Sequence, residues 1–488
     1  MKYITATDFY NYTQCKYLVY LNKFGDKTLQ DSVSDFVKML WEKGIQHEKT
    51  IIFKMAELEN KSIFEVDNKK PANQETYKET MKLMNKGVDY IYQGVLINDN
   101  YIGRPDLLKK VDGDSSLGSY NYIPIDIKAG RGYEGEDEHS GKIKKSYSLQ
   151  LTFYALLLGK IQNLTPTKGN IINIDGQYID YELDIDNKEF TKILDDIKQI
   201  SLKNELYEPV IGGKCGLCQW KSFCKKWAKE NDDLSLLFNL GEYKYGMQEY
   251  GINKVSEILD TSLEDWLDKL PEIKKGGYFK GIAEKRLTDY YKRALVFKKN
   301  KEIIYNKIVF PKGSKEIHFD IEDDPTQDIV YLYGFWIREN DKEYYKYILA
   351  KTIDDEKKAT EELWEFLESN KDIPIYHYAP HEKSTLRRLQ KKYKLNPEIL
   401  NSFNKNAIDM YSIIKKNTDF PISSYGLKPI CKYLGFNWSA EDAGGANSIE
   451  WYSRYLNGNK DIMNKILKYN KEDCKATAFL KDYLEDAK

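Results

Sequence analysis

The chain has 488 residues, of which 41% are apolar and 31% are charged, and its formal net charge at pH 7 is −1. That length exceeds what one ordinary hydrophobic core supports, so we expect two or three globular domains rather than a disordered chain. No stretch approaches the roughly 18 uninterrupted apolar residues of a membrane span, and the N-terminus lacks a signal-peptide pattern, so we expect a cytoplasmic protein with no membrane partner.

The first region, residues 1–230, mixes helical and strand patterns. Apolar spacing predicts helices over 35–58 and 146–161, and alternation predicts strands over 101–111 and 120–130. Turn-forming residues lie between the two strands, in the sequence DGDSSLG, which predicts a hairpin.

The rest of the chain divides into a helical part and a mixed part. Residues 231–300 are helical in pattern with glycine breaks, which predicts a small helical connector. Residues 301–488 open with strand patterns over 316–324, 328–337 and 343–350, then alternate a strand over 373–379 with helices. That order is typical of an α/β layer domain, and α/β is the fold class that we expect for the chain.

Two aspartates and a lysine converge in the predicted hairpin. Its centre falls near residue 116, so Asp106 and Asp126 would lie opposite each other, and Asp126 and Lys128 would share a strand face. Paired carboxylates hold a hard cation such as Mg²⁺, and a lysine beside them can orient or deprotonate an attacking water and stabilise charge on a phosphate. The alternative is a solvated hairpin face with ordinary charges.

The motifs around these residues, GRPD and IDIK, resemble the split acidic motif of the PD-(D/E)xK nucleases, with Asp126 where many members carry Glu. RecB-like members of that superfamily add a helical histidine upstream, and a glutamine with a tyrosine on the helix after the lysine. The chain has His47 in GIQHE, and Gln150 and Tyr154 in QLTFY. The resemblance therefore implies a metal ligand at His47 and substrate-side support from the helix of Gln150.

Three cysteines, Cys215, Cys218 and Cys224, stand at metal-ligand spacing and leave a tetrahedral site one ligand short. RecB-like nucleases with an iron–sulfur cluster have one cysteine before the nuclease core and a C-x2-C-x5-C group after it. Cys15 completes that layout, so the resemblance implies a [4Fe–4S] cluster that staples the two ends of the nuclease domain. A structural zinc in the same thiolates and a chance group of free thiols are the alternatives.

A second set of acids lies in the third region. Asp320 and Glu322 share one face of a predicted strand, where carboxylates need a partner cation. Glu382 lies where a strand passes into a helix, and Tyr469 and Asp473 lie one turn apart on the last helix. Four acids could hold two Mg²⁺ ions about 4 Å apart for in-line displacement at a phosphodiester, with Tyr469 positioning the water. Singly, each acid would be a solvated surface carboxylate.

These acids stand in motifs that resemble those of the DEDD exonucleases of the RNase H-like fold, specifically the 3'–5' exonuclease-like domain found fused to RecB-like nucleases. FDIE matches the first motif, and YNKED matches the Tyr-x3-Asp third motif. The second motif departs from the usual pattern, because Glu382 stands where Asp is common and is one methylene longer. Asp409, in a helical pattern, is expected to support the site rather than to bind metal.

Further stretches favour contact with a nucleic acid strand. The connector resembles helix-hairpin-helix modules, whose glycine-containing turns offer backbone N–H groups to phosphates, with a plain spacer as the alternative. Basic and aromatic runs at 141–147 and 286–301 could track a single strand by charge and stacking, or could be solvated helix faces.

The motifs together predict three domains. These are a RecB-like PD-(D/E)xK nuclease domain with the four-cysteine cluster at 1–230, a helical connector at 231–300, and an RNase H-like DEDD exonuclease domain at 301–488. We expect an Mg²⁺- or Mn²⁺-dependent nuclease that cleaves DNA, single-stranded or end-exposed, at two centres. The alternatives are an RNA exonuclease or processing enzyme of the same architecture, and a catalytically weakened nucleic-acid-binding scaffold.

Overall fold

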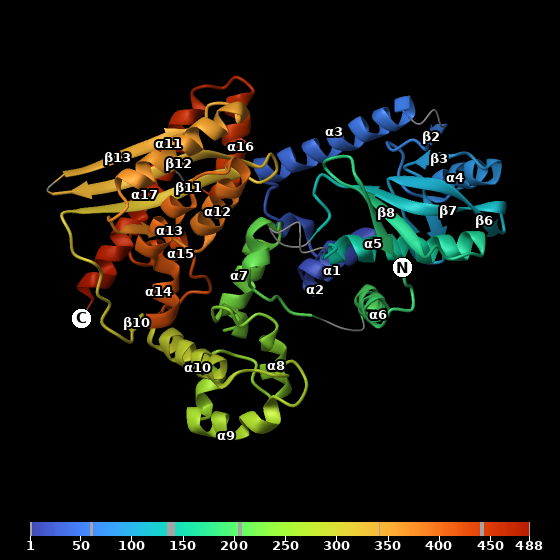
Figure 1. The fold of residues 1–488 in the computed structure, drawn as a ribbon. Helices are drawn as coiled ribbons and strands as arrows, with labels where there is room; N and C mark the ends of the chain where they lie inside the picture. The colour runs from blue at the N-terminus through green and yellow to red at the C-terminus, as the bar shows by residue number, and fades with distance from the viewer. Residues whose placement is uncertain are drawn as a thin grey trace. The chain divides into compact units, whose positions relative to one another are not determined.

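The computed structural model describes residues 2–58, 62–133, 142–203, 207–340, 342–439 and 444–487. The basic run at 141–147 therefore begins one residue outside the described ranges. The chain divides into two compact units, one of residues 1–209 and 214–223 and the other of residues 210–213 and 224–488 (Figure 1). No helix in the described ranges is long and apolar enough to cross a membrane.

The first unit contains a six-stranded sheet of order β2-β3-β6-β7-β8-β9 and a three-stranded sheet of order β1-β5-β4. The strands are β1 (Ile4–Thr5), β2 (Ile63–Glu65), β3 (Tyr90–Tyr92), β4 (Leu96–Asn98), β5 (Tyr101–Gly103), β6 (Leu107–Ser115), β7 (Gly118–Ile127), β8 (Lys168–Ile172) and β9 (Tyr178–Glu182). The helices are α1 (Ala6–Gln14), α2 (Lys16–Phe24), α3 (Asp35–Leu58), α4 (Gln74–Lys86), α5 (Lys145–Gln162) and α6 (Lys188–Leu202). The helices predicted over 35–58 and 146–161 are thus confirmed as α3 and α5.

Strands β6 and β7 form the predicted hairpin. Leu107 pairs with Ile125, so the residues before and after them, Asp106 and Asp126, face each other across the two strands. The strand predicted over 101–111 is interrupted, because β5 ends at Gly103 and β6 begins at Leu107. Asp106 therefore lies at the break, directly before the first paired residue of β6.

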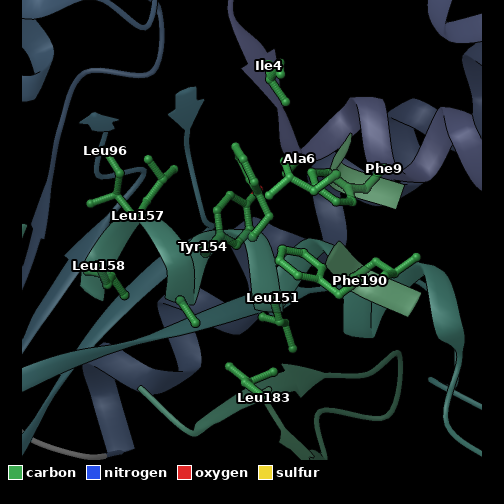
Figure 2. Packing of buried hydrophobic residues seen from close by; sticks show 14 of the residues in the cluster. Ile4, Ala6, Phe9, Leu96, Leu151, Tyr154, Leu157, Leu158, Leu183 and Phe190 are labelled. Atoms are coloured by element: carbon green, nitrogen blue, oxygen red, sulfur yellow. The ribbon is translucent and has the colours of Figure 1, made fainter. Parts of the chain in front are cut away.

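Aromatic packing holds the helices of the first unit together, as Figure 2 shows. The ring of Phe9 on α1 lies 5.1 Å from that of Phe153 on α5 and stacks at 5.3 Å on Phe190 of α6. Tyr154 and Leu151 of α5 belong to the same buried cluster. This core fixes α5 against the sheet, on the side where Tyr154 approaches the hairpin.

Residues 231–300 are helical, as predicted, and contain α8 (Tyr243–Glu249), α9 (Leu263–Ile273) and α10 (Glu284–Lys299). Helix α7 (Lys221–Glu230) precedes them; it starts in the first unit and ends in the second. A core of their own stabilises them, with Met247, Trp266 and Tyr290 buried in it. This helical segment also packs on the α/β part of the same unit, because Arg293 forms a buried ion pair of 2.9 Å with Asp419.

A five-stranded sheet of order β13-β12-β11-β14-β15 forms the centre of the α/β part. Strands β12 and β13 are antiparallel to their neighbours, whereas β14 and β15 run parallel to β11. The strands are β11 (Lys315–Asp324), β12 (Ile329–Glu339), β13 (Lys342–Leu349), β14 (Ile375–His377) and β15 (Ala407–Asp409), with a separate pair β10 (Ile303–Ile304) and β16 (Thr418–Asp419). The helices are α11 (Glu356–Ser369), α12 (His381–Tyr393), α13 (Pro397–Asn406), α14 (Met410–Asn417), α15 (Leu427–Tyr433), α16 (Gly445–Leu456) and α17 (Ile462–Asp486).

Alternation along β11 sends its acids and its apolar residues to opposite faces of the sheet. Ile317, Phe319 and Ile321 enter a core that they share with α11. Asp320 and Glu322 occupy the other face, where α17 packs on β11 and β12. The strand pattern thereby places the first acidic motif opposite the last helix.

Asp409 lies at the end of a strand, so its predicted place within a helix is wrong. It ends β15, and its Oδ1 accepts hydrogen bonds from the backbone N–H groups of Tyr411 at 3.0 Å and Ser412 at 3.3 Å, which caps α14. A strand of three residues is too short to show alternation, and an N-cap residue directly precedes the helical pattern that it caps.

Candidate active sites

The hairpin brings Asp106, Asp126 and Lys128 together. The backbone N–H of Asp106 donates to Asp126 Oδ1 at 3.3 Å, and Asp106 Oδ2 accepts from the N–H of Ile127 at 2.7 Å. Lys128 Nζ lies 2.8 Å from Asp126 Oδ2. Asp126 is buried, so the β-sheet register places two carboxylates and one ammonium group in a water-poor site.

Electrostatics at this first centre favour a bound cation. Burial and the Asp126 carboxylate raise the pKa of Asp106 to about 8. Burial alone would lower the pKa of Lys128, but the carboxylates of Asp126 and Asp106 outweigh it and raise that pKa. Among the described residues, Asp126 Oδ2 has the lysine beside it but accepts no aligned hydrogen bond. The donor set therefore fits a divalent cation, which would stabilise both acids in their ionised form.

A third carboxylate, Glu48 of α3, joins this centre through Gln93. Gln93 Nε2 donates to Glu48 Oε1 at 2.7 Å and to Asp106 Oδ1 at 3.3 Å. Glu48 is one of the charges that raise the pKa of Asp106. Neither residue was predicted from the sequence, although Glu48 directly follows His47 in GIQHE.

The second centre lies between β11 and α17. One carboxylate oxygen from each of Asp320, Glu322 and Asp473 lies within 4.8 Å of the others, close enough to share a metal ion. Tyr469 lies one turn before Asp473 on α17, and both are buried. These four residues were named from the sequence, and the fold brings them together.

Burial raises the pKa values of all three acids, and neighbouring carboxylates in the group raise those of Asp320 and Glu322 further. Burial, followed by the charges of Asp473, Glu322 and Glu382, holds the pKa of Asp320 well above its usual range. Burial and Asp473 raise the pKa of Glu322 to about 8, and burial raises the pKa of Asp473. Glu322 Oε1 is buried and has no hydrogen-bond partner among the described residues. Such an uncompensated oxygen in a cluster of acids is a suitable ligand for a hard cation.

Comparison with known families assigns both regions. Residues 16–225 match the family model of the PD-(D/E)XK nuclease superfamily, and residues 317–485 match that of the RNase_H superfamily. The chain joins one domain of each superfamily. The expected fusion and its α/β fold class are therefore confirmed, and nuclease superfamilies at both ends indicate a protein that acts on nucleic acid.

Similarity to individual proteins is limited. No curated protein matches the chain. Among solved structures, the family B DNA polymerase from the hyperthermophilic archaeon Pyrobaculum calidifontis matches at 16% identity and a TM-score of 0.30 over 45% of this chain. The match spans 34% of that polymerase chain, about a third of its length.

In the RNase_H domain, Glu382 approaches the acidic group from α12. It acts on the pKa of Asp320 but lies outside the group of three whose oxygens are within 4.8 Å of one another. Its Oε2 lies 3.2 Å from His377 Nδ1, and the same ring nitrogen lies 2.8 Å from the carbonyl oxygen of Ala379. Asp409 accepts from the N–H of Ala379 at 3.0 Å and holds that residue at a φ of 71°. Asp409 thus supports the turn that leads to Glu382.

Three polar side chains that no sequence pattern predicted complete the RNase_H site. Lys428 Nζ donates to Tyr469 Oη at 3.0 Å and lies 4.1 Å from the centre of its ring. Trp438 Nε1 donates to Asp473 Oδ1 at 2.6 Å, and Asn470 Nδ2 donates to Asp320 Oδ2 at 2.8 Å. Asn470 could have been found from helical spacing, since it lies three residues before Asp473. Lys428 and Trp438 come from segments whose approach depends on the tertiary fold.

In the PD-(D/E)XK domain, His47 lies apart from the paired aspartates. Its Nε2 lies 3.0 Å from the carbonyl oxygen of Asn173, and among the described residues it does not join Asp106 and Asp126 in a group within 4.8 Å. On α5, Tyr154 is buried and donates to the carbonyl oxygen of Arg104 at 3.4 Å, while Gln150 lies one turn earlier and is partly buried. The metal-binding role of His47 stays a prediction.

The cysteines divide between the units. Burial raises the pKa of the Cys218 thiol, and the thiols of Cys215 and Cys15 raise it further, so these three lie close enough to interact. Cys224 falls in the second unit. Among the described residues, Cys15, Cys215 and Cys218 do not come within 4.8 Å of one another as a set. The described geometry therefore supports neither the iron–sulfur cluster nor the zinc ion, and both stay predictions.

Proposed function

We propose that the chain is a divalent-metal-dependent nuclease that hydrolyses phosphodiester bonds of DNA, with single-stranded or end-exposed substrates, at both centres. The observation that carries the proposal is the convergence of Asp320, Glu322 and Asp473 on one buried point of the RNase_H domain. Buried acids with raised pKa values that converge on one point are typical of metal-dependent phosphoryl-transfer sites.

In the RNase_H domain, Asp320, Glu322, Glu382 and Asp473 would hold Mg²⁺ or Mn²⁺. Bound metal supplies Lewis-acid stabilisation of the phosphate and lowers the pKa of the attacking water. Tyr469, fixed by Lys428 at 3.0 Å, would orient that water. Asn470 restricts the Asp320 carboxylate to one orientation through its 2.8 Å hydrogen bond.

In the PD-(D/E)XK domain, Asp106, Asp126 and His47 would hold the metal. Lys128, whose ammonium group stays protonated beside Asp126, would orient the water and stabilise charge on the phosphate. Gln150 and Tyr154 on α5 would support the substrate side. The raised pKa of Asp106 makes metal binding here compete with a proton.

Cleavage by single-site variants tests this assignment. Asp106→Ala should remove cleavage by the PD-(D/E)XK centre, Asp320→Ala should remove cleavage by the RNase_H centre, and the double variant should lack Mg²⁺-dependent cleavage. Matched DNA and RNA oligonucleotides, in single-stranded and duplex form, decide the substrate. The double variant retaining full cleavage would show that the chemistry lies elsewhere, and faster cleavage of RNA would favour the RNA-processing alternative.

A nucleic-acid-binding scaffold is the second candidate, because Glu382 lies outside the closest acidic group. Its longer side chain departs from the usual acid of the DEDD pattern, so the RNase_H centre could bind a strand without cleaving it. Tight binding of single-stranded DNA without turnover in Mg²⁺ or Mn²⁺ would favour the scaffold.

We further propose that Cys15, Cys215, Cys218 and Cys224 bind a [4Fe–4S] cluster that joins the two ends of the PD-(D/E)XK domain. Support comes from the packing of residues 214–223 on the N-terminal helices, where Lys214 Nζ donates to the carbonyl oxygen of Thr13 at 2.6 Å. Anaerobic purification with iron, sulfide and zinc quantified tests the cluster. About four irons per chain would agree with the proposal, whereas one zinc and no iron would show that the four cysteines bind a zinc ion instead of the cluster.

We also propose the boundaries 1–230, 231–300 and 301–488 for the three domains, with the connector as a helix-hairpin-helix-like module that contacts phosphates. Gly251 and Gly281 each adopt a positive φ, of 77° and 73°, directly before the buried residues Ile252 and Ile282. The N–H groups of these four residues donate to backbone carbonyls of the connector, so contact with phosphates would depend on exposed basic side chains such as Lys280. Salt-dependent DNA binding that weakens on Lys280→Glu would agree with this role.

A further inference from the structure

A pocket of about 350 Å³ opens in the first unit between α3 and the turn that joins β8 to β9. Its walls are apolar, with Ile51 and Met55 contributed by α3 and Ile172 and Ile174 by the end of β8 and the following turn. Tyr178, the first residue of β9, is 43% exposed and provides an aromatic ring, and its hydroxyl lies 3.7 Å from the sulfur of Met55. A pocket at the small end of the usual ligand range, with a partly exposed aromatic wall, suits one flat ring system.

Polar groups at the rim of this pocket offer both donors and acceptors. His47, Thr50 and Lys54 line it from α3, and Asp175 lines it from the β8–β9 turn. The turn is held in place by Asn173, whose Oδ1 accepts from the N–H of Asp175 at 3.0 Å. Nucleobases present donors and acceptors on their edges and an apolar face for stacking, which matches an apolar pocket with a mixed polar rim.

The pocket adjoins the strand that carries the catalytic motif. Ile172 of its wall pairs with Ile127 in the parallel β7–β8 ladder, and its carbonyl oxygen accepts from the N–H of Lys128 at 2.9 Å. Because side chains alternate along a strand, those of Ile127 and Ile172 point to the sheet face opposite to that of Asp126 and Lys128, so the pocket lies on the α3 face, next to the carboxyl ends of β7 and β8. On α3, His47 of the rim directly precedes Glu48, which the Gln93 amide joins to Asp106.

We propose that this pocket binds one unstacked nucleobase of the DNA strand whose phosphate lies at the PD-(D/E)XK centre. The inference rests on the proposed nuclease function and names the part of the substrate that the domain holds. An unstacked base is available in single strands and frayed ends, and in an intact duplex it must first be extruded at a cost of a few kcal/mol. The pocket therefore selects single-stranded or end-exposed DNA by shape and stacking.

Filling the pocket tests the inference. Thr50 is exposed, and its hydroxyl bonds to the carbonyl oxygen of Gln46 in its own helix at 2.9 Å, so Thr50→Trp should fill the pocket without unfolding α3. Ile45→Trp is the matched control, because Ile45 is an exposed residue of the same helix that does not line the pocket. Tyr178→Leu is a second variant, which removes the aromatic wall but keeps its apolar character.

The measurement is the affinity of the full-length protein in EDTA for fluorescently labelled single-stranded oligonucleotides, each with one abasic position. Wild type should bind about tenfold less tightly when one particular base is missing, the size expected for one stacked base. Thr50→Trp should bind the intact strand about tenfold less tightly and lose nothing further on removal of that base, with an intermediate effect for Tyr178→Leu. Ile45→Trp should behave as wild type.

Two outcomes would overturn the proposal in distinguishable ways. Tight binding with no abasic position that matters, or an abasic effect unchanged in Thr50→Trp, would reject the base pocket and leave the nuclease function standing. No binding of single-stranded DNA together with no Mg²⁺-dependent cleavage would reject the pocket and the proposed function together.

Discussion

At the scale of single residues, Lys428 connects Tyr469 to the acids of the RNase_H centre. Burial lowers the pKa of Lys428, whereas Asp473, Glu322 and Asp320 raise it, which places its charge near all three acids. Lys428→Met removes both the donor to Tyr469 and this charge, so we expect cleavage by the RNase_H centre to fall about 10²-fold. The rate is measured on single-stranded DNA in an Asp106→Ala background.

The conservative variant separates a chemical role of Lys428 from a packing role. Lys428→Arg keeps the charge and a donor, so it should retain more cleavage than Lys428→Met at equal thermal stability. Equal rates for the two variants would contradict the assigned role. The methionine variant should also shift the pH profile of cleavage upward, because loss of a neighbouring positive charge raises the pKa values of the acids.

The buried acids also predict how stability depends on pH. Asp106 and Glu322 each have a pKa of about 8 in the folded protein, against about 4 in an unfolded chain. Between these values the folded state binds more protons, so the free energy of unfolding should fall as the pH rises from about 4 to about 8. Thermal unfolding in EDTA at several pH values measures this slope.

A divalent cation should counteract that loss. Because metal binds the ionised acids, Mn²⁺ should raise the melting temperature more at pH 8 than at pH 5.5. In a variant that carries both Asp106→Asn and Glu322→Gln, the slope in EDTA should flatten. A wild-type stability that rises with pH over this range would contradict the raised pKa values.

At the scale of elements, the packing of α17 on β12 depends on one glycine. Gly334 pairs with Asp320 across β11 and β12, and a Cβ there would lie 1.6 Å from Asn470 Oδ1. Gly334→Ala should therefore displace Asn470, lower the free energy of unfolding by about 1–3 kcal/mol, and reduce cleavage by the RNase_H centre. Chemical denaturation and the Asp106→Ala cleavage assay measure both effects.

A matched control for this substitution lies in α3. A Cβ on Gly44 would meet nothing within 4 Å, so Gly44→Ala should stabilise the protein by about 0.5–1 kcal/mol through higher helix propensity. If Gly334→Ala were as harmless as Gly44→Ala, then α17 would not be seated on β12 as the structure has it.

Local sequence patterns predicted the helices and strands whose structure follows from the residues within the element itself. The helix α3 matches its predicted range of 35–58, and the β6–β7 hairpin has the register that places Asp106 opposite Asp126. Both follow from periodicity and turn residues within a short stretch. Asp409 was misplaced because a strand of three residues shows no period.

Contacts between segments far apart in the sequence were not predicted, for a different reason. Lys428, Trp438 and Glu48 reach their centres only after elements far apart in the chain have packed, so no spacing in the sequence indicates them. The acids themselves were found because strand and helix periods place them on shared faces. The sequence therefore predicted the acidic residues of the two centres better than the neighbouring side chains that orient these acids.

At the scale of the whole molecule, a segment at the end of the PD-(D/E)XK unit packs on residues near its start, up to 198 residues earlier in the chain. Trp220 is 1% exposed, and its Nε1 donates to Asn22 Oδ1 at 2.9 Å. Asp31 accepts from the N–H of Ser222 at 3.0 Å, and a Cβ on Gly25 would meet the Trp220 ring at 2.5 Å. The ends of the unit are therefore joined by packing as well as by the proposed cluster.

This arrangement predicts that a substitution can abolish cleavage at one centre and leave cleavage at the other unchanged. Trp220→Ala should lower the stability of the first unit by about 3–5 kcal/mol, because it leaves a large cavity. Cleavage by the PD-(D/E)XK centre, measured in an Asp320→Ala background, should fall with it, whereas the RNase_H centre in an Asp106→Ala background should keep its rate. The second unit has its own cores and none of them contains Trp220, so an equal loss at both centres would mean that the units fold as one.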